Sequence, residues 1–428
     1  MRTLFVRSAT LLLITLSLWV AGQQSAIAGG HAAEQSQQDD DAQVRFEAAM
    51  AALEAEKVYT ARRLLRDLLG DYPSLHRARL ELARADYLAR DYDAAEAEIL
   101  QVLDDPEVPA SVQTTLLAFL AQIRDDRTVF ARRHDWSGQL YGGLTWDSNV
   151  NYGADDVIDI GGTPFLSDED EDVGAVIDVG LLHTFNPNRT FEHDEQTGYF
   201  LWQTQGNAYY RSYFDVTESN LGVLTLRTGP AWVVPEDWRF TIGLQADQLF
   251  YGTENLALFT SIRPQFTKQL TDVSGYTVSV TAQERSYDDV ENEPRDGRYY
   301  RAAFSYDRLL GNRVGSQIGV AWSDFDADGD QFSYDGYEVF AGLTYEAWQR
   351  GQVFGRIGYR QFDFEQPDPL VGPGVFRDDD EWWAIVGFRH ELASTVAKGW
   401  TVRGDVIYTD NQSNVALYDY DRWQVNLG

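Results

Sequence analysis

The stretch from Trp136 to Asn151, WSGQLYGGLTWDSNVN, separates two parts of the chain that follow different hydrophobic periods. Before it, apolar residues recur at helical spacing. From Trp136 to Trp146, lipid-compatible residues alternate with small or polar ones, and the rest of the chain keeps this alternation. A period of two is typical of strands with one apolar and one polar face. The chain is therefore predicted to join a helical domain to a long run of amphipathic strands.

Charge and cysteine content exclude several classes of protein. The chain has 428 residues, 67 Asp and Glu against 35 Lys and Arg, a formal net charge of -32 and no cysteine. Its length suits two domains. Nucleic-acid binding is disfavoured because a protein that neutralises phosphates needs a basic surface. Without cysteine there is no disulfide, no thiol catalysis and no zinc-thiolate site.

The N-terminus has the three parts of a secretory signal peptide, predicted over residues 1–28. Arg2 and Arg7 precede an apolar run from Leu11 to Val20, and Ala26-Ile27-Ala28 ends it with the small-x-small pattern of a cleavage site. The alternative is an uncleaved anchor. Residues 29–41 are polar and are expected to form a disordered lead-in. No other stretch suits a spanning helix, so a further membrane contact would have to be a barrel.

Residues 42–133 are predicted to form a small helical domain with a 34-residue repeat. Paired positions share their residue class: Ala49 with Ala83, Leu53 with Tyr87, Ala61 with Ala95, Leu65 with Ile99, and Leu68 with Val102. This period is that of tetratricopeptide repeats. Prolines at 73 and 106 end the helices near the repeat boundaries. A further amphipathic helix at about 111–124 would cap the two repeats.

Repeats of this kind present a face to a peptide or protein. Tyr59, Arg63, Tyr92 and Glu96 are the residues that we expect to contact such a client. The alternative interpretation is that the helices only plug or brace the barrel, in which case these four residues are ordinary solvated surface.

Residues 136–428 are predicted to form an outer-membrane β-barrel, which makes the whole chain an α+β multidomain protein. In Val173–Leu181, for example, Val173, Ile177 and Leu181 share one face and Asp178 lies on the other. We count fourteen strands, an even number that suits a closed bacterial barrel. Their expected bounds are 136–149, 173–185, 197–212, 217–231, 238–251, 257–270, 275–287, 298–310, 313–325, 333–348, 351–364, 381–393, 399–411 and 416–428.

Strand and loop lengths favour a membrane barrel over a soluble sandwich. The strands are long, and their ends are rich in Trp, Tyr and Phe, as in the aromatic girdles of barrels. Connections after even strands are mostly brief, and those after odd strands are longer and acidic. Bacterial barrels keep their short turns in the periplasm, so the helical domain is expected there too. The exception is 186–196, expected as a long periplasmic connection that contacts the helical domain.

Charged residues on the polar face of the strands are expected to line the lumen. They are Asp178, Asp247, Arg356, Arg360, Arg403 and Asp405. They could line a path for a polar or unfolded substrate, but a charge ladder that fills the interior is the favoured interpretation. We find no nucleophile with an ordered base, and we expect no catalytic residue, cofactor or metal site.

Three acidic motifs are interpreted as loops. Asp324 to Asp335 has the spacing of a calcium-binding loop, except that Asp stands where Glu is usual, and it lies between strands instead of helices. A solvated acidic hairpin is favoured. Asp168 to Asp172 is likewise interpreted first as a solvated loop and second as a cation or basic-partner site. Asp147-Ser148-Asn149 is expected to form the turn that ends the first strand.

The junction between the two domains resembles the surface lipoprotein assembly modulator family. The resemblance rests on LELARADYLARDYDAAEAEI, the linker RRHDW, the stretch DSNVN at 147–151 and the closing DRWQVNLG, and it covers about residues 45–428. DSNVN after a repeat domain is its most specific part. Two departures accompany it: the helical domain is short, and the chain stops at Gly428 without the terminal aromatic residue usual in such barrels.

This resemblance implies an outer-membrane protein that assists the surface display of client lipoproteins or related secreted proteins. Its expected partners are outer-membrane lipids, the client and the barrel assembly machinery, with no nucleic acid and no covalent catalysis. Two alternatives remain: a diffusion porin, which would need no repeat domain, and an exopolysaccharide exporter, whose lumen should carry many aromatic and acidic groups.

Overall fold

The computed structural model describes most of the chain beyond the N-terminal segment: residues 32–105, 108–154, 158–160, 163–165, 169–367, 372, 374–393 and 399–428. The expected signal peptide lies outside the described residues. The chain divides into two compact units, residues 1–117 and 118–428. The first helix begins at Ala32, so the prediction of disorder up to residue 41 is wrong from that point on. Its alanine, glutamate and glutamine residues are good helix formers.

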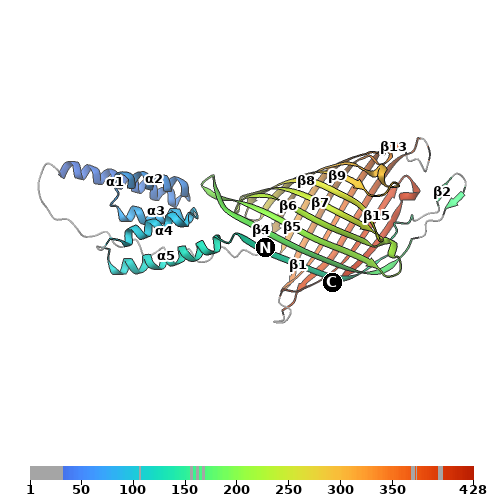
Figure 1. Cartoon of the computed structure of the whole chain (residues 1–428), viewed down its shortest axis with the longest axis horizontal. Helices are drawn as coiled ribbons and strands as arrows, with labels where there is room; N and C mark the ends of the chain where they lie inside the picture. Colours follow the sequence, from blue (N-terminus) through green and yellow to red (C-terminus); the bar gives the residue numbers. More distant parts are fainter. Residues whose placement is uncertain are drawn as a thin grey trace. The chain divides into compact units, whose positions relative to one another are not determined.

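Five helices form the N-terminal region, as predicted. They are α1 (Ala32–Glu54), α2 (Val58–Asp71), α3 (His76–Leu88), α4 (Tyr92–Leu103) and α5 (Ala110–Phe130). Helices α1 to α4 pack consecutively against one another (Figure 1). The second half of α5 belongs to the unit that contains the barrel. Among the described residues, no helix combines the length and the apolar character needed to cross a membrane.

The 34-residue period appears in both the packing and the backbone. Its paired positions are buried, Leu65 and Ile99 completely so, except for Tyr87, which is half-buried. Glu56 and Arg90, which are 34 residues apart, both have φ of 59° where the first helix of each pair ends. The following amide donates to a carbonyl five residues back in each case, at 2.8 Å from Lys57 to Ala52 and at 2.8 Å from Asp91 to Asp86. The two helix pairs therefore share one turn geometry.

A buried ion cluster ties the two helix pairs together. Arg62 of α2 donates to Asp86 of α3 and to Asp91, each at 2.6 Å, and Arg66 donates to Asp86 at 2.9 Å. Burial raises the pKa of the Asp86 carboxyl, and Arg62 and Arg66 act in the opposite direction. Because a buried carboxylate without its partner is costly, this cluster fixes how α2 meets α3.

Fourteen strands form one closed antiparallel barrel (Figure 1). They are β1 (His134–Asp147), β4 (Asp172–His193), β5 (Gln196–Tyr213), β6 (Leu221–Val234), β7 (Trp238–Tyr251), β8 (Glu254–Thr271), β9 (Ser274–Tyr287), β10 (Gly297–Leu310), β11 (Val314–Ala327), β12 (Tyr334–Trp348), β13 (Gly351–Pro367), β14 (Phe376–Glu391), β15 (Thr401–Ser413) and β16 (Tyr420–Leu427). Each pairs with its neighbour in sequence, and β1 pairs with β16. The predicted strand count is confirmed. Two short strands, β2 (Ile158–Ile160) and β3 (Thr163–Phe165), form a separate hairpin between β1 and β4.

The outer face of the wall is apolar and exposed. Along β12, Tyr337, Val339, Leu343 and Tyr345 are 45–56% exposed, and they alternate with inward-facing residues such as Glu338. An apolar band between aromatic residues is unfavourable in water and suits a bilayer, whose hydrocarbon region it matches. The fold is therefore a transmembrane β-barrel preceded by a helical region.

The two ends of the barrel differ in their connections. We call the end where β1 begins the proximal end and the end where β1 finishes the distal end. Proximal turns are short at 194–195, 235–237, 272–273, 311–313 and 349–350, whereas the connection at 392–400 is longer. Distal connections include 148–171, 214–220, 288–296 and 328–333, and four of the distal connections hold a short 3-10 helix. The loop asymmetry expected from the sequence is thus present, except that the distal turn at 252–253 has only two residues.

The prediction of a long connection at 186–196 is wrong. Strand β4 continues to His193 and turns into β5 through Asp194 and Glu195, which both have positive φ. The strand continues because the residues after a bulge at 186–188 pair again with β5. Asn186 lies at this bulge: its amide donates to Arg133 O at 2.8 Å, and its side chain donates to Phe130 O at 3.3 Å. The bulge thus anchors the end of α5 to the wall.

The outward orientation of β12 makes a prediction about stability. Ala341 lies midway between Tyr337 and Tyr345 on the outer face, so Ala341→Arg should destabilise the barrel by about 2–4 kcal/mol in lipid. Thr344→Arg, on the inner face, should cost far less because it enters a polar cavity. Urea unfolding in vesicles, followed by tryptophan fluorescence, measures both. Equal destabilisation by the two variants would contradict the assigned faces.

Candidate functional site in the barrel lumen

The residues predicted to line the lumen lie on four strands: Asp178 on β4, Asp247 on β7, Arg356 and Arg360 on β13, and Arg403 and Asp405 on β15. Only Arg403 and Asp405 pair with each other, at 2.7 Å. Asp178 accepts from Asn207 at 2.9 Å, and Asp247 accepts from Thr225 at 2.6 Å. The structure thus distributes the predicted set around the wall instead of gathering it into one site.

Arg360 belongs to a charge ladder whose other members were not predicted. It pairs with Glu381 at 2.7 Å and with Glu338 at 3.4 Å, and Glu338 also pairs with Arg301. These residues come from β10, β12, β13 and β14. The alternation of each strand indicates that they face inward, but only the register shows that they meet. This ladder agrees with the favoured interpretation that lumen charges neutralise one another.

Arginines also stack on aromatic rings along the inner wall of β9 to β14. The Arg285 guanidinium lies 4.2 Å from the ring centre of Tyr299 and 4.5 Å from that of Phe325. Arg356 lies 4.0 Å from the ring centre of Phe340. Such cation–π contacts contribute about 0.5–2 kcal/mol each. They also fix the direction in which the arginines point, so this side of the lumen is lined by rings whose faces are partly covered.

Asp147 is the centre of a buried network at the distal end. It is fully buried, and its carboxylate accepts from Arg422 Nε at 2.8 Å, from Arg422 Nη2, from the Tyr213 hydroxyl and from Gln424 at 3.0 Å. The ring of Tyr152 covers the guanidinium of Arg422 at 4.3 Å. These groups come from β1, β5, β16 and the loop after β1. We call this network the closure cluster, because it joins the first and last strands.

The rest of the DSNVN stretch extends the closure cluster. Asn149 is fully buried, donates to Gly153 O at 2.9 Å and to Asp421 O at 3.2 Å, and accepts from the Gly153 amide. Ser148 Oγ accepts from the Trp423 amide at 2.8 Å. The interpretation of Asp147–Asn149 as an ordinary turn is therefore too weak. These residues end the strand and also attach it to β16.

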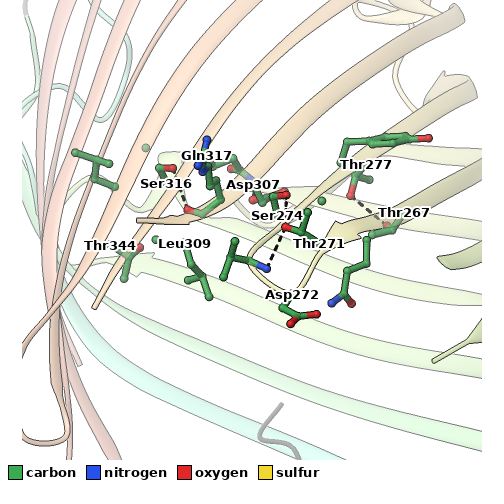
Figure 2. A pocket seen from close by; sticks show the side chains of 18 of the residues that line it. Thr267, Thr271, Asp272, Ser274, Thr277, Asp307, Leu309, Ser316, Gln317 and Thr344 are labelled. Atoms are coloured by element: carbon green, nitrogen blue, oxygen red, sulfur yellow. Dashed lines mark hydrogen bonds between the residues drawn. The ribbon is translucent and has the colours of Figure 1, made fainter. Parts of the chain in front are cut away.

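A polar cavity of about 670 Å³ lies inside the barrel at the proximal end (Figure 2). The hydroxyls of Thr267 and Thr277 are 3.1 Å apart across β8 and β9, and those of Thr271 and Ser274 are 2.8 Å apart in the turn. Asp307, Gln317 and Thr344 continue the lining over β10 to β12. Hydroxyl, amide and carboxylate groups thus contribute to the lining at this mouth of the barrel.

The acidic motifs have structural partners. Asp324 lies opposite Asp335 across β11 and β12, so the calcium-like spacing is spread over a hairpin. Among the described residues, no group of three or more His, Asp or Glu is arranged to hold a metal ion. Asp168 lies outside the described residues. Asp172 accepts from the amides of residues 215 and 216 at 2.8 Å each, and so it holds the neighbouring loop.

The predicted client-binding residues lie on the second helix of each pair. Tyr59 and Arg63 belong to α2, and Tyr92 and Glu96 belong to α4. Arg63 is exposed, and the other three are half-buried. The Tyr59 ring lies 5.3 Å below the Arg62 guanidinium, and Tyr92 meets Tyr87 edge to face. The two tyrosines therefore also pack within the domain, and the role of all four residues stays a prediction.

The fold and the lumen define a transmembrane β-barrel with an N-terminal helical domain. A family described as a protein of unknown function, DUF2860, matches residues 271–428, which include strands β9 to β16 and are less than half of the chain. No curated protein matches the chain significantly.

Several solved barrel structures are similar to part of this chain. Pseudomonas aeruginosa OprD is 10% identical, with a TM-score of 0.36, over 70% of this chain and 96% of its own. The outer membrane channel DcaP of Acinetobacter baumannii is 12% identical, with a TM-score of 0.36, over 68% and 96%. A loop-deletion form of the outer membrane protein OmpT of Vibrio cholerae is 9% identical, with a TM-score of 0.37, over 68% and 98%.

The closure cluster makes a second prediction. Asp147→Ala leaves the Arg422 guanidinium buried without its counter-charge, which should cost about 3–5 kcal/mol. The temperature at which the folded barrel converts to the unfolded band in a gel-shift assay should fall clearly. Asp147→Asn, which keeps hydrogen-bonding atoms, should have an intermediate effect.

Asp326→Ala is the matched control for this prediction. Asp326 is an exposed carboxylate near the same end and makes no ion pair within the described part of the chain. If Asp147→Ala melts at the temperature of Asp326→Ala, the closure cluster does not hold the barrel together.

Proposed function

We propose that this protein resides in the bacterial outer membrane and assists client lipoproteins or related secreted proteins in reaching the cell surface. In this proposal, the helical domain lies in the periplasm and binds the client, and the barrel provides the route or the docking site at the membrane. No covalent catalysis is required. The proposal identifies the chain with the surface lipoprotein assembly modulator family that its junction resembles.

The observation that carries the proposal is the repeated helical unit joined, through α5, to the first strand of a membrane barrel. Two helix pairs with one turn geometry form a scaffold suited to binding an extended segment of another protein. A barrel that served only for diffusion would need no such scaffold.

Orientation and location are supported by the asymmetry of the loops. Helix α5 joins β1 at the proximal end, where most turns are short. In bacterial barrels, short turns face the periplasm and longer loops face outward. The closed wall with its apolar outer face suits the bacterial outer membrane, where we expect the barrel assembly machinery to insert it.

A channel for polar solutes or polysaccharide is the second candidate. Specific features favour it: the polar proximal cavity, the aromatic rings on the inner wall, and carboxylates such as Glu338 and Glu381. Aromatic and acidic groups together are what a saccharide path would need. Several of the ring faces are occupied by arginines of the chain itself, which makes them less available to a sugar.

The test is surface display of candidate lipoproteins, read by protease treatment of intact cells. Cells that lack the protein are compared with cells that carry Tyr59→Ala, Arg63→Ala, Tyr92→Ala and Glu96→Ala together. We expect at least one lipoprotein to lose surface exposure in both strains while its total amount stays constant. The physical reason is that the client must contact the helical face before it reaches the barrel.

Glu47→Ala with Asp67→Ala is the matched control, because both residues are exposed on the same helical unit. Display should be normal in this strain. If display is normal in all strains while small-solute permeability or polysaccharide release changes, the channel replaces the display function.

A further inference from the structure

Three arginines of the inner wall lack the partners that the other lumen charges have. They are Arg227 on β6, Arg239 on β7 and Arg263 on β8. On the opposite wall, arginines pair with carboxylates, as Arg360 does with Glu381 and Arg403 does with Asp405. Within the described part of the chain, none of the three makes an ion pair or stacks on an aromatic ring. This stretch of wall therefore carries uncompensated positive charge.

The register brings the three side chains together. Arg227 lies opposite Gln245, and Arg263 lies opposite Gly243, in the next inward-facing row. Arg239 donates to Gln203, whose backbone partner is Gly229. Arg227 and Arg263 both meet Gln245, because Arg227 lies opposite its backbone and Arg263 donates to its side chain at 3.2 Å. We call Arg227, Arg239 and Arg263 the arginine cluster.

Two glycines make room for the arginine cluster. At Gly243, an added Cβ would lie 2.4 Å from Arg227 Nε, so only glycine lets this side chain lie against the wall. At Gly229, an added Cβ would lie 3.4 Å from Gly243 Cα, so the two glycines adjoin. The Arg227 guanidinium thus lies directly against the backbone of Gly243.

The neighbouring groups are neutral or already engaged. Arg239 and Arg263 contact amide oxygens, that of Gln203 and, at 3.2 Å, that of Gln245. The nearest carboxylates in sequence are Asp237, which pairs with Lys268, and Asp247, which accepts from Thr225 and from Gln245 Nε2 at 2.8 Å. Amide oxygens carry only partial charge, so they do not neutralise three guanidinium groups.

We infer that the arginine cluster is a binding site for a small oxyanion, a solute that carries carboxylate, phosphate or sulfate groups. Guanidinium groups bind such oxygens in bidentate fashion. Positive side chains grouped inside a membrane pore are how pores select anions. Charged residues that face the lumen of a membrane barrel tune its selectivity.

The net negative charge of the chain contrasts with the positive charge of the arginine cluster. The chain carries -32, and a surface of that sign repels anions from solution. A cationic patch inside the barrel of such an acidic protein gives the lumen a selectivity opposite to that of the whole molecule. The site does not depend on the proposed role in lipoprotein display, because it requires only that the lumen admit a small solute.

The test measures binding of pyranine, a trisulfonated fluorescent dye, to the full-length protein in neutral detergent by fluorescence anisotropy. The wild type should bind the dye at low salt, and inorganic phosphate should compete. The variant Arg227→Gln with Arg239→Gln and Arg263→Gln should bind at least tenfold more weakly. The corresponding triple lysine variant, which keeps the charge, should retain most of the affinity.

Arg298→Gln is the control for each single glutamine variant, because Arg298 is exposed on the outer face and the substitution removes one positive charge, as each of them does. It should bind like the wild type. Absence of dye binding to the wild type, undiminished binding to the folded triple glutamine variant, or an equal loss in Arg298→Gln would each overturn the inference. If the triple variant fails to fold, the three single glutamine variants replace it, and each should weaken binding several-fold.

Discussion

Closure of the wall is the constraint on which the rest of the structure depends. A strand edge left open in a bilayer exposes backbone amides and carbonyls that no water can satisfy. Here β1 pairs with β4 along its whole length and with β16 from Leu144 to Asp147. The closure cluster strengthens this seam, because Asp147 and Arg422 are 275 residues apart in sequence and share a buried ion pair. A buried ion pair therefore lies where the sheet must meet itself.

The positions of the charged residues matter more for the barrel than the net charge of the chain. The chain is strongly acidic, yet the inner wall carries many arginines, and most of the contacts described above place them beside a carboxylate or an aromatic ring. On β10 to β16, opposite charges neutralise one another, which stabilises a polar interior. On β6 to β8, Arg227, Arg239 and Arg263 have no such carboxylate within the described residues, although Lys268 pairs with Asp237. Two regions of one lumen thus differ in electrostatic character, although inward-facing and outward-facing residues alternate in the same way in both.

The helical region is built by repeating one kind of helix pair. Each helix pair buries alanines at the close approach and larger apolar residues at the seam, and each ends its first helix with a residue of positive φ. Buried Arg62, held by Asp86 and Asp91, then sets how one pair meets the next. The link to the barrel is local: Asn186, at the bulge of β4, holds the last residues of α5 and the start of β1.

Much of the fold could be read from periodicity. A period of two places a side chain inside or outside the wall, and a period of 34 places alanines and leucines in the helical core, because both depend only on local backbone geometry. The fourteen strands and the buried state of Leu65 and Ile99 follow from these patterns. The end of β4 does not, because its continuation past a bulge depends on pairing with β5 and not on its own residues.

Only part of the candidate site could be predicted from sequence periodicity. Alternation in the sequence predicts that Asp178, Asp247, Arg356, Arg360, Arg403 and Asp405 share the inner face. Which charges are neutralised follows from the folded barrel alone, because partners such as Glu338 and Arg360, or Asp147 and Arg422, come from different strands and meet through register. The folded barrel also decided that Arg227, Arg239 and Arg263 lie together without carboxylate partners in the described chain. Alternation determines a face, whereas electrostatics depends on distance across strands, which no single strand encodes.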